Sequence, residues 1–307
     1  MKMKFIVLLC FTVLCSCKDQ DDNQVPQENN PPNVLGMDYT KSTRSFEETY
    51  TALISSLSAN ENIKIIAEVD HTLNAESVSE TLNPTRIVFF GNPNLGTPLM
   101  QQNQLAGLDL PQKIVVYKNS EDDVYLGFNN TTYLSNRHDL NGVATLPTIQ
   151  GALENLSKGA SQDNIMGAAN SSVTLEEGIL LKTTDNKSFD DVYAGLKMAI
   201  DNNPNLKIIA ELDHQANAEG IGEELSPTKI IIFGNPNLGT PLMQNAQTTA
   251  LDLPQKMLVW QRQDGPVNVS YNDPAFLMKR HGITENESIL ETISTALDNL
   301  SNAAIAN

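Results

Sequence analysis

Cysteine is nearly absent from this sequence of 307 residues. The three cysteines are Cys10, Cys15 and Cys17, so everything after position 17 lacks a thiol. This absence excludes disulfide bridges and cysteine nucleophiles from the main part of the chain. Tryptophan occurs once and histidine four times, which leaves few side chains for acid-base or metal chemistry.

Basic residues are also scarce. The sequence holds 20 Lys and Arg against 37 Asp and Glu, a formal net charge of −17. Binding to phosphates requires clustered Lys and Arg, so we expect neither a nucleic acid nor an anionic membrane surface as partner. At this length, we expect two domains of ordinary size, each able to bury its own core.

The first residues have the order of a secretory signal. Lys2 and Lys4 precede an apolar run over residues 5–14, which is too short to cross a bilayer permanently. The string Leu14-Cys15-Ser16-Cys17 resembles a bacterial lipobox, which implies lipid attachment (palmitate) at Cys17. An ordinary cleaved signal is the alternative interpretation.

The following segment predicts a tether and a location. Residues 18–32 are rich in Asp, Asn, Gln and Pro and have almost nothing to bury, which is typical of disorder. We expect a cell-envelope lipoprotein of the outer membrane, held only by its lipid. The acidic stretch after Lys18 resembles an export tag for the external face, although a solvated linker explains it equally well.

An internal repeat of about 143 residues organises the rest of the chain. Gly91–Gln101 recurs without change as Gly234–Gln244, and Leu108–Lys113 recurs as Leu251–Lys256. Identity over such lengths indicates a duplicated domain. The predicted organisation is a signal peptide over 1–16, a tether over 17–32, a first repeat domain over 33–159, a linker over 160–172 and a second repeat domain over 173–307.

Hydrophobic periodicity in the second copy predicts the order β-α-β-β-β-β-α. The expected strands are 178–183, 207–212, 228–233, 255–260 and 267–271. The expected long helices begin after Ser188, which can serve as an N-cap, and at Glu287. Short helical insertions are expected after Asn217, Thr240 and Pro274. This order predicts an α+β fold with a curved, mainly antiparallel sheet and both long helices on one face.

Several strings in this pattern resemble a known family, the domain of unknown function 302 family. They are Asp213-His214, residues 233–236, 239–244, 252–254, 269–274 and 279–282. Both copies match, although Asn130-Thr131 and Asp139 depart from the pattern in copy one. The resemblance implies a fold similar to the TATA-binding-protein class, with no implication for DNA binding. The resemblance to this family does not indicate a biochemical role.

The four histidines fall at equivalent places in the two copies: His71 with His214, and His138 with His281. They are the candidate catalytic residues. His71 and His214 follow a strand and precede Asn74 or Asn217, which resembles a helix N-cap, and we expect these imidazoles to be neutral. A hydrogen-bonded structural turn is the alternative. Arg137-His138 and Arg280-His281 close a short helix, where capping is the simpler interpretation.

The repeated Gly91 loop is the strongest candidate for a binding element in the sequence. A strand ends at Gly91, the chain turns at Asn92, and Thr97-Pro98 has the signature of a helix start whose free amides could hold an anion or carboxylate. A turn kept for packing is the alternative. The candidate ligand-binding residues are Gly91, Asn92, Thr97, Gly234, Asn235, Thr240, His214, Tyr271 and Asp273.

No motif defines a reaction, a metal site or a cofactor. The ligand spacings of metal sites, a phosphate-loop lysine and a nucleophile elbow are all missing from the sequence. We expect a non-enzymatic envelope module that binds a small molecule or an envelope protein, with the Gly234 loop, His214 and His281 at one rim. The alternatives are a hydrolase or isomerase with His214 or His71 as general base, and a structural pair whose sheets meet edge to edge.

The two copies differ at five positions near the candidate site. The second copy has Trp260, Tyr271, Asp273, Pro274 and Gly282 where the first has Tyr117, Phe128, Asn130, Thr131 and Asp139. Loss of a hydroxyl and a carboxylate would weaken a ligand held by those groups. We therefore expect the second copy to carry the principal site.

Overall fold

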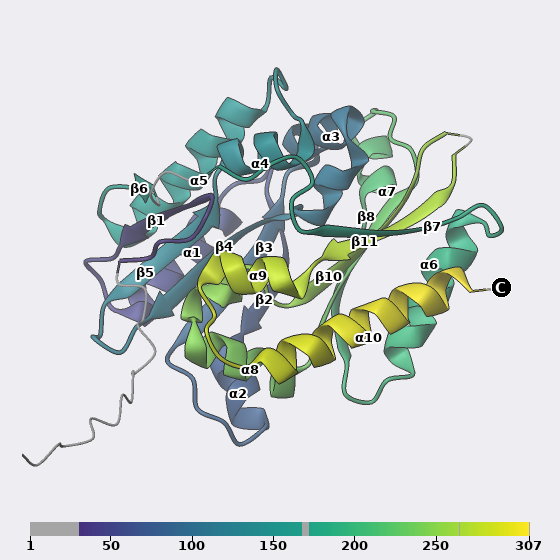
Figure 1. Cartoon of the computed structure of the whole chain (residues 1–307). Coiled ribbons are helices and arrows are strands. Elements are labelled where there is room, and N and C mark those ends of the chain that lie inside the picture. The colour runs from purple at the N-terminus through teal and green to yellow at the C-terminus, as the bar shows by residue number, and fades with distance from the viewer. Residues whose placement is uncertain (1–30, 168–171, 264, 307) are drawn as a thin grey trace, which may run out of the picture.

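The computed structural model describes residues 31–167, 172–263 and 265–306. The predicted signal peptide, Cys17 and the tether up to residue 30 lie outside these ranges. The predicted repeat domains are both described (Figure 1).

The first copy contains five strands of one sheet with helices between them. Its elements are β1 Met37–Lys41, α1 Phe46–Ser58, β2 Lys64–Asp70, α2 His71–Ser77, β3 Thr85–Gly91, α3 Pro93–Gln102, the 3₁₀ helix η1 Gln104–Leu108, β4 Gln112–Lys118, β5 Val124–Asn129, α4 Thr131–His138 and α5 Leu146–Ser161. A short strand, β6 Met166–Gly167, lies in the predicted linker and pairs with β1.

The second copy repeats this order. Its elements are β7 Ile179–Thr184, α6 Phe189–Asp201, β8 Lys207–Asp213, α7 His214–Glu219, β9 Thr228–Gly234, α8 Pro236–Asn245, η2 Gln247–Leu251, β10 Gln255–Gln261, β11 Val267–Asn272, α9 Pro274–His281 and α10 Glu287–Ile305. Every predicted strand and long helix of this copy is present, displaced by only a few residues at the ends.

Each copy builds one antiparallel sheet. The strand orders are β2-β3-β4-β5-β1-β6 and β7-β11-β10-β9-β8. The long helices pack in pairs, α1 with α5 and α6 with α10, and cover one face of each sheet (Figure 1). The predicted α+β class and the one-sided placement of the long helices are confirmed.

The long helices begin where the sequence provides a cap. The Ser188 side chain accepts a hydrogen bond from the Asp191 amide, as predicted, and Ser45 forms a complete capping box with Glu48 in the first copy. Along α6, Val192, Leu196 and Ile200 are fully buried, so helical spacing places one apolar stripe on the sheet.

The short helices begin earlier than predicted. Asn92 is the N-cap of α3 and Pro93 its first residue, which places Thr97 inside the helix. The N-cap of α2 is Asp70, whose side chain accepts a hydrogen bond from the Leu73 amide, so Asn74 is not a cap. Asn235 and Asp213 have the same roles in the second copy, and Thr240 and Asn217 are helical.

The second face of each sheet is covered by the other copy. Helix η1 lies on β9, β10 and β11, where Leu108 packs in one cluster with Trp260. Helix η2 lies on β3 and β4, where Leu251 packs in one cluster with Phe89. Full burial of such a leucine stabilises the fold by about 1.5–3 kcal/mol, so the coverage is a substantial part of the stability.

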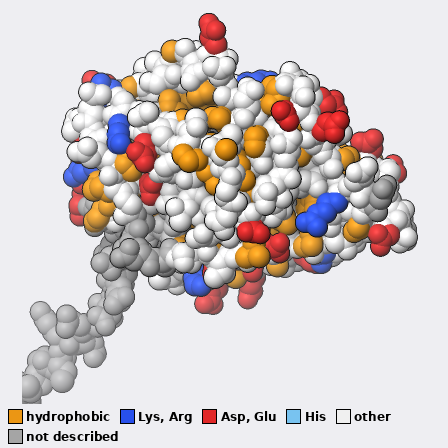
Figure 2. Space-filling model, turned by 90° about the horizontal axis from the view of Figure 1, so that it is seen from above, with side chains coloured by type: hydrophobic (Ala, Val, Ile, Leu, Met, Phe, Trp, Pro, Cys, Tyr) orange, Lys and Arg blue, Asp and Glu red, His pale blue; other side chains and the backbone are white. Residues whose placement is uncertain are grey.

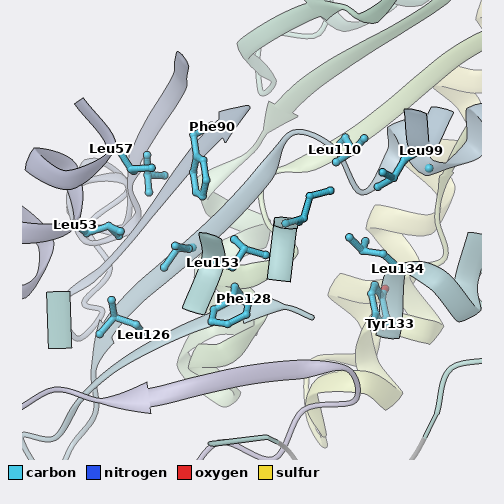
Figure 3. Close-up of a cluster of buried hydrophobic side chains, with 14 of the residues drawn as sticks. Leu53, Leu57, Phe90, Leu99, Leu110, Leu126, Phe128, Tyr133, Leu134 and Leu153 are labelled. Carbon is cyan, nitrogen blue, oxygen red and sulfur yellow. The ribbon is translucent and has the colours of Figure 1, made fainter. Parts of the chain in front are cut away.

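Two glutamines fix this reciprocal coverage. The Gln104 amide donates a hydrogen bond of 2.8 Å to Thr228 Oγ1, and the Gln247 amide donates one of 2.8 Å to Thr85 Oγ1. The largest apolar cluster, shown in Figure 3, also crosses the boundary, since it includes Leu277 of the second copy. Each copy does bury a core under its own long helices, as the cluster around Val192 and Leu297 shows for the second copy. The other apolar face of each sheet is buried by the other copy.

In the part of the chain that the structure describes, the two sheets do not pair edge to edge through backbone hydrogen bonds, contrary to what the structural alternative expected. The edge strands β2 and β8 contact each other, but no ladder of backbone hydrogen bonds joins the two sheets in the described ranges. The copies associate mainly through η1, η2 and the helix pairs α2 with α8 and α3 with α7. These helix pairs become important for the site.

The surface carries the acidic excess of the sequence. On the face in Figure 2, acidic side chains project around the edge and basic side chains are few. Among the residues described, no helix is long and apolar enough to cross a bilayer.

Candidate ligand-binding pockets

Two cavities lie at equivalent places in the two copies. Each has a volume of about 100 Å³ and is bounded by the Gly-Asn-Pro loop, the end of the central strands and a long helix. Pocket 1 is defined by the loop 91–97, and pocket 2 by the loop 234–240. The repeated loop, the strongest binding candidate of the sequence, thus lines a cavity in both copies.

Most of the lining of each pocket is apolar. Pocket 1 contains Phe90, Met100, Leu110 and Leu153 among its walls. The equivalent residues of pocket 2 are Phe233, Met243, Leu253 and Leu297. Among the positions that line both pockets, only Ile63 and Leu206 differ in residue type. The pocket walls are thus almost unchanged between two copies that differ elsewhere.

Each pocket is also lined by a histidine of the other copy. His214 and Asn217 of α7 line pocket 1, whose loop belongs to the first copy. His71 and Asn74 of α2 line pocket 2, whose loop belongs to the second copy. This follows from the packing of α3 against α7 and of α2 against α8. The structure therefore separates His214 from the Gly234 loop, which were expected at one rim.

Three buried polar atoms in each pocket lack a hydrogen-bond partner among the described residues. In pocket 1 they are His214 Nε2, Thr97 Oγ1 and Gln112 Nε2, and in pocket 2 they are His71 Nε2, Thr240 Oγ1 and Gln255 Nε2. Buried polar groups are usually satisfied, and leaving one without a partner costs about 1–3 kcal/mol. The same three residue types are thus left with unused hydrogen-bonding capacity in both pockets.

The two pocket histidines are neutral at physiological pH. Burial lowers the pKa of His71 and of His214 to about 4, despite the nearby carboxylates of Asp70 and Asp213. The His71 ring is hydrogen-bonded to the Leu253 backbone and its Nε2 has no partner, so Nδ1 donates to that carbonyl. The Nε2 lone pair of His71 is then left as a hydrogen-bond acceptor. The predicted neutrality is supported, with burial as the main cause.

The first-turn amides of the loop helices are not free. The amide of Asn94 donates to Asn92 Oδ1, and the amides of Leu95 and Gly96 donate to the Asn92 carbonyl. Asn235 satisfies the corresponding amides in the second copy. The expected use of free amides at this loop to hold an anion is therefore wrong, because the asparagine cap already uses them.

His138 and His281 lie away from both pockets, fully buried at the interface between the copies. His281 Nε2 is 2.8 Å from Asp252 Oδ2, and His138 Nε2 is 2.7 Å from Asp109 Oδ2. Burial lowers the pKa of both rings, and the carboxylates oppose it. Gly282 is the left-handed C-cap residue predicted for α9. His281 does not share a rim with His214.

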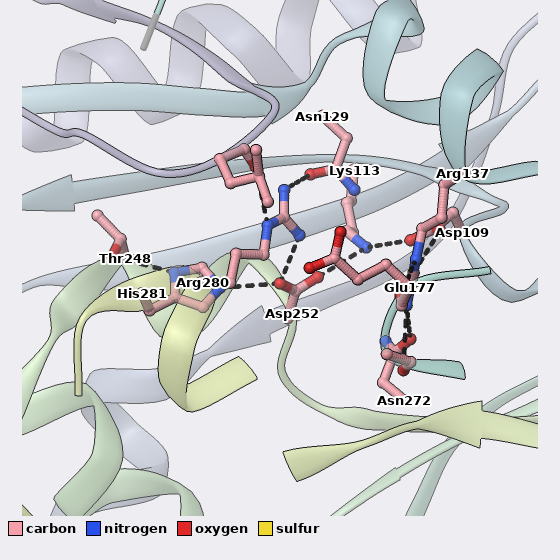
Figure 4. Close-up of polar contacts among 12 residues, drawn as sticks. Asp109, Lys113, Asn129, Arg137, Glu177, Thr248, Asp252, Asn272, Arg280 and His281 are labelled. Carbon is pink, nitrogen blue, oxygen red and sulfur yellow. Dashed lines mark hydrogen bonds and ion pairs between the residues drawn. The ribbon is translucent and has the colours of Figure 1, made fainter. Parts of the chain in front are cut away.

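The neighbouring arginines connect the two copies symmetrically (Figure 4). Arg137 donates to Asp109 at 2.7 Å within its own copy and to Asn272 of the other at 2.8 Å. Arg280 donates to Asp252 at 2.6 Å and to Asn129 at 2.6 Å in the same way. Burial alone would raise the pKa of each aspartate, but the arginine holds it well below the usual value. These residues form a structural network at the interface.

Two buried lysines complete this network. Lys113 Nζ lies 3.5 Å from Asp252 Oδ1 and 3.9 Å from Asp109 Oδ1. Burial, together with the charge on Lys113, keeps the pKa of Lys256 well below its ordinary value. These lysines were not among the predicted site residues, although the repeated Leu-Asp-Leu-Pro-Gln-Lys string places a carboxylate and a lysine in an apolar segment.

Tyr271 and Asp273 do not line either pocket. Tyr271 is buried in the core of the second copy, and Asp273 is the N-cap of α9. The residues that distinguish the copies are therefore structural, whereas the pocket residues are shared. The structure gives no basis for a principal site in copy two. Within the described ranges, no group of three or more His, Cys, Asp and Glu is arranged to hold a metal ion.

The fold and the paired pockets define a tandem α+β protein with two equivalent pockets at the boundary between its repeats. The family model described as "Domain of unknown function DUF302" matches residues 39–156 and 181–300, so the chain belongs to this family. A solved structure, the uncharacterized conserved protein DUF302 from Bacillus stearothermophilus, aligns with 42% of this chain and 98% of its own at 14% identity and a TM-score of 0.36.

Part of the chain is also similar to named proteins of Brucella. It is 45% identical over 78 residues to the fluoride-specific ion channel FluC 1 of Brucella suis biovar 1, and equally to that of Brucella abortus biovar 1. The match covers 25% of this chain and 31% or 29% of those relatives, so the chain spans less than a third of their length.

Proposed function

We propose that this protein binds two molecules of one small ligand, one in each pocket between its copies. The observation that carries the proposal is the repeated set of unsatisfied His, Thr and Gln atoms in pockets whose walls are almost identical. Sites for small molecules are typically apolar concavities with a few convergent polar groups. Two such sites in one chain favour a binding module.

Catalysis is the weaker alternative. A general base works best with a pKa near the operating pH, and the pKa of about 4 makes His71 and His214 poor bases at neutral pH. The nearest carboxylate of the first copy, Asp70, is engaged as a helix cap and with Arg86 at 2.7 Å, so it does not orient the imidazole. Binding requires neither feature.

The proposed setting is the bacterial envelope, with the module tethered to the outer membrane through a lipid on Cys17. The lipobox-like string supports this, and so does the polar segment that separates it from the first strand. Replacement of Cys17 by alanine is expected to release the protein from the membrane fraction. Retention of Cys17→Ala in that fraction would exclude lipid anchoring.

A thermal-shift screen of the full chain without its signal peptide tests the binding proposal. The library should hold metabolites of a few carbon atoms, with fluoride added because of the Brucella relatives. A ligand at a hundred times its Kd stabilises the folded state by about 2.7 kcal/mol.

Two cavity-filling variants locate the binding. Ala152→Phe on α5 fills pocket 1 and Ala296→Phe on α10 fills pocket 2. Gly151→Phe is the control, because an added Cβ at Gly151 meets no atom within 4 Å. Each single variant should bind the ligand at one site, and the double variant should not bind it. A shift that survives in the double variant, or no shift with any compound, would overturn the proposal.

A further inference from the structure

One exposed lysine lines each pocket and forms no ion pair with an acidic residue of the described chain. Lys64 lines pocket 1 and Lys207 lines pocket 2, and both side chains are exposed. Each is the direct strand partner of the glycine that begins the loop, since Lys64 pairs with Gly91 and Lys207 with Gly234. The two copies thus place a cation at the same point beside the same loop.

These two lysines differ from the other exposed and half-exposed lysines of the described chain. Each of the others contacts a carboxylate or, for Lys187, a backbone carbonyl. Lys64 and Lys207 have no ion pair or hydrogen bond of their side chains in the described residues. In a sequence with nearly twice as many acidic as basic residues, two lysines without an ion pair at equivalent places in the two pockets favour a negatively charged ligand group.

The polar residues that line the pockets also favour a negatively charged ligand group. Neither pocket has an aspartate or glutamate among its lining residues. The unsatisfied Gln112 Nε2 and Gln255 Nε2 can only donate, and the threonine hydroxyls can donate as well. A carboxylate can accept hydrogen bonds from these donors. Because the lysine beside it is exposed to solvent, the carboxylate also stays partly hydrated, which avoids the cost of burying an unpaired charge.

The rest of the cavity limits the size and polarity of the ligand. Its walls are apolar, and its volume of about 100 Å³ is somewhat below that of an engineered cavity of about 150 Å³ that holds benzene. The bound body is therefore apolar and contains no more than about six carbon atoms. The net charge of −17 weakens but does not cancel this attraction, because charges beyond about 8 Å are screened at physiological salt.

We infer that the ligand of these pockets is a small monocarboxylic acid with an apolar body, its carboxylate held by Lys64 and Gln112 in pocket 1 and by Lys207 and Gln255 in pocket 2. This inference rests on the proposed function and narrows it to one chemical class.

Calorimetric titration of the full chain with hexanoate and with hexan-1-ol tests the inference. The two probes share an apolar body, so their difference isolates the carboxylate. Hexanoate should bind at two sites per chain and more tightly than hexan-1-ol, and its affinity alone should fall with added salt. The double variant Lys64→Glu and Lys207→Glu should weaken hexanoate about three- to tenfold and leave hexan-1-ol unchanged. Lys118→Glu is the matched control, since Lys118 lines neither pocket.

The outcomes separate the two proposals. Binding of hexan-1-ol as tight as that of hexanoate, or hexanoate binding that ignores the lysine reversals, would overturn the carboxylate inference and leave the two-site proposal standing. If the lysine double variant no longer binds hexanoate but the double variant Ala152→Phe with Ala296→Phe still does, the acid binds outside the pockets, and the inference is overturned as well. Failure of both probes together with an empty screen would overturn both proposals.

Discussion

Arg137 of the first copy donates a hydrogen bond of 2.8 Å to Asn272 Oδ1 of the second, and no solvent reaches either side chain to a significant extent. The same guanidinium holds Asp109 at 2.7 Å. One arginine therefore satisfies a buried carboxylate of its own copy and a buried amide of the other. Removal of its charge affects both folding units at once.

We predict that Arg137→Gln and Arg280→Gln each destabilise the whole chain by about 3–5 kcal/mol, because a buried aspartate loses the guanidinium that compensates its charge. The measurement is urea denaturation followed by circular dichroism. Arg262→Gln is the control, since this exposed side chain only lies over the Trp260 ring at 5.6 Å, and its loss should cost less than about 1 kcal/mol. Costs below about 1 kcal/mol for both buried arginines would disprove the structural role of the network.

The lysines of the network are predicted to share one charge. Lys256→Met should change stability by less than about 1.5 kcal/mol, because burial already disfavours the charged form of Lys256 and methionine has a similar volume. Lys113→Met should also be mild, since the same carboxylates attract Lys256, which can then take the proton. The double variant should cost about 1–3 kcal/mol more than the sum of the single ones. Strictly additive costs in a double-mutant cycle would contradict this.

Acid should destabilise the protein below pH 6.5. The unfolded chain protonates His71 and His214 near pH 6.5, whereas the folded chain does so only near pH 4, so the unfolded state binds more protons in this window. Each histidine then costs about 2 kcal/mol of stability between pH 7.5 and pH 5. The lowered pKa values of Asp109 and Asp252 act in the same direction at lower pH.

Denaturation at the two pH values, with His71→Leu and His214→Leu combined, checks this. The double variant should lose about 4 kcal/mol less than the natural sequence on acidification. An identical loss in both proteins would mean that the pocket histidines are not held neutral by burial.

Local patterns predicted the elements of the fold well. Alternation of apolar residues identified the strands, and Ser188 identified the start of α6, because these signals act over a few residues. The start of α3 was mispredicted because Asn92-Pro93 and Thr97-Pro98 both have a cap followed by proline. The structure uses the first pair, in which Asn92 satisfies three backbone amides of the first turn.

The composition of the pockets could not be predicted in the same way. The repeat identified the Gly91 loop, but an exact duplication does not show whether that loop packs against the histidine of its own copy or of the other. The answer depends on which copy covers the second face of each sheet. That coverage is determined by contacts between residues far apart in the sequence, namely the packing of η1 and η2 and the interface that contains Arg137 and Arg280. Of the candidate residues, the loop and both pocket histidines line cavities, whereas His138, His281, Tyr271 and Asp273 do not.

The claim that each pocket joins both copies is tested most directly by placing His214→Leu in chains with a single open site. In the Ala296→Phe background only pocket 1 is open, and in the Ala152→Phe background only pocket 2 is open. The affinity is measured by calorimetric titration with the ligand from the thermal-shift screen. Adding His214→Leu to Ala296→Phe should weaken binding about fivefold, because pocket 1 loses one hydrogen bond to the ligand. Adding His214→Leu to Ala152→Phe should change the affinity by less than about twofold. Weakening confined to the Ala152→Phe background would mean that His214 serves the loop of its own copy, which would contradict the account.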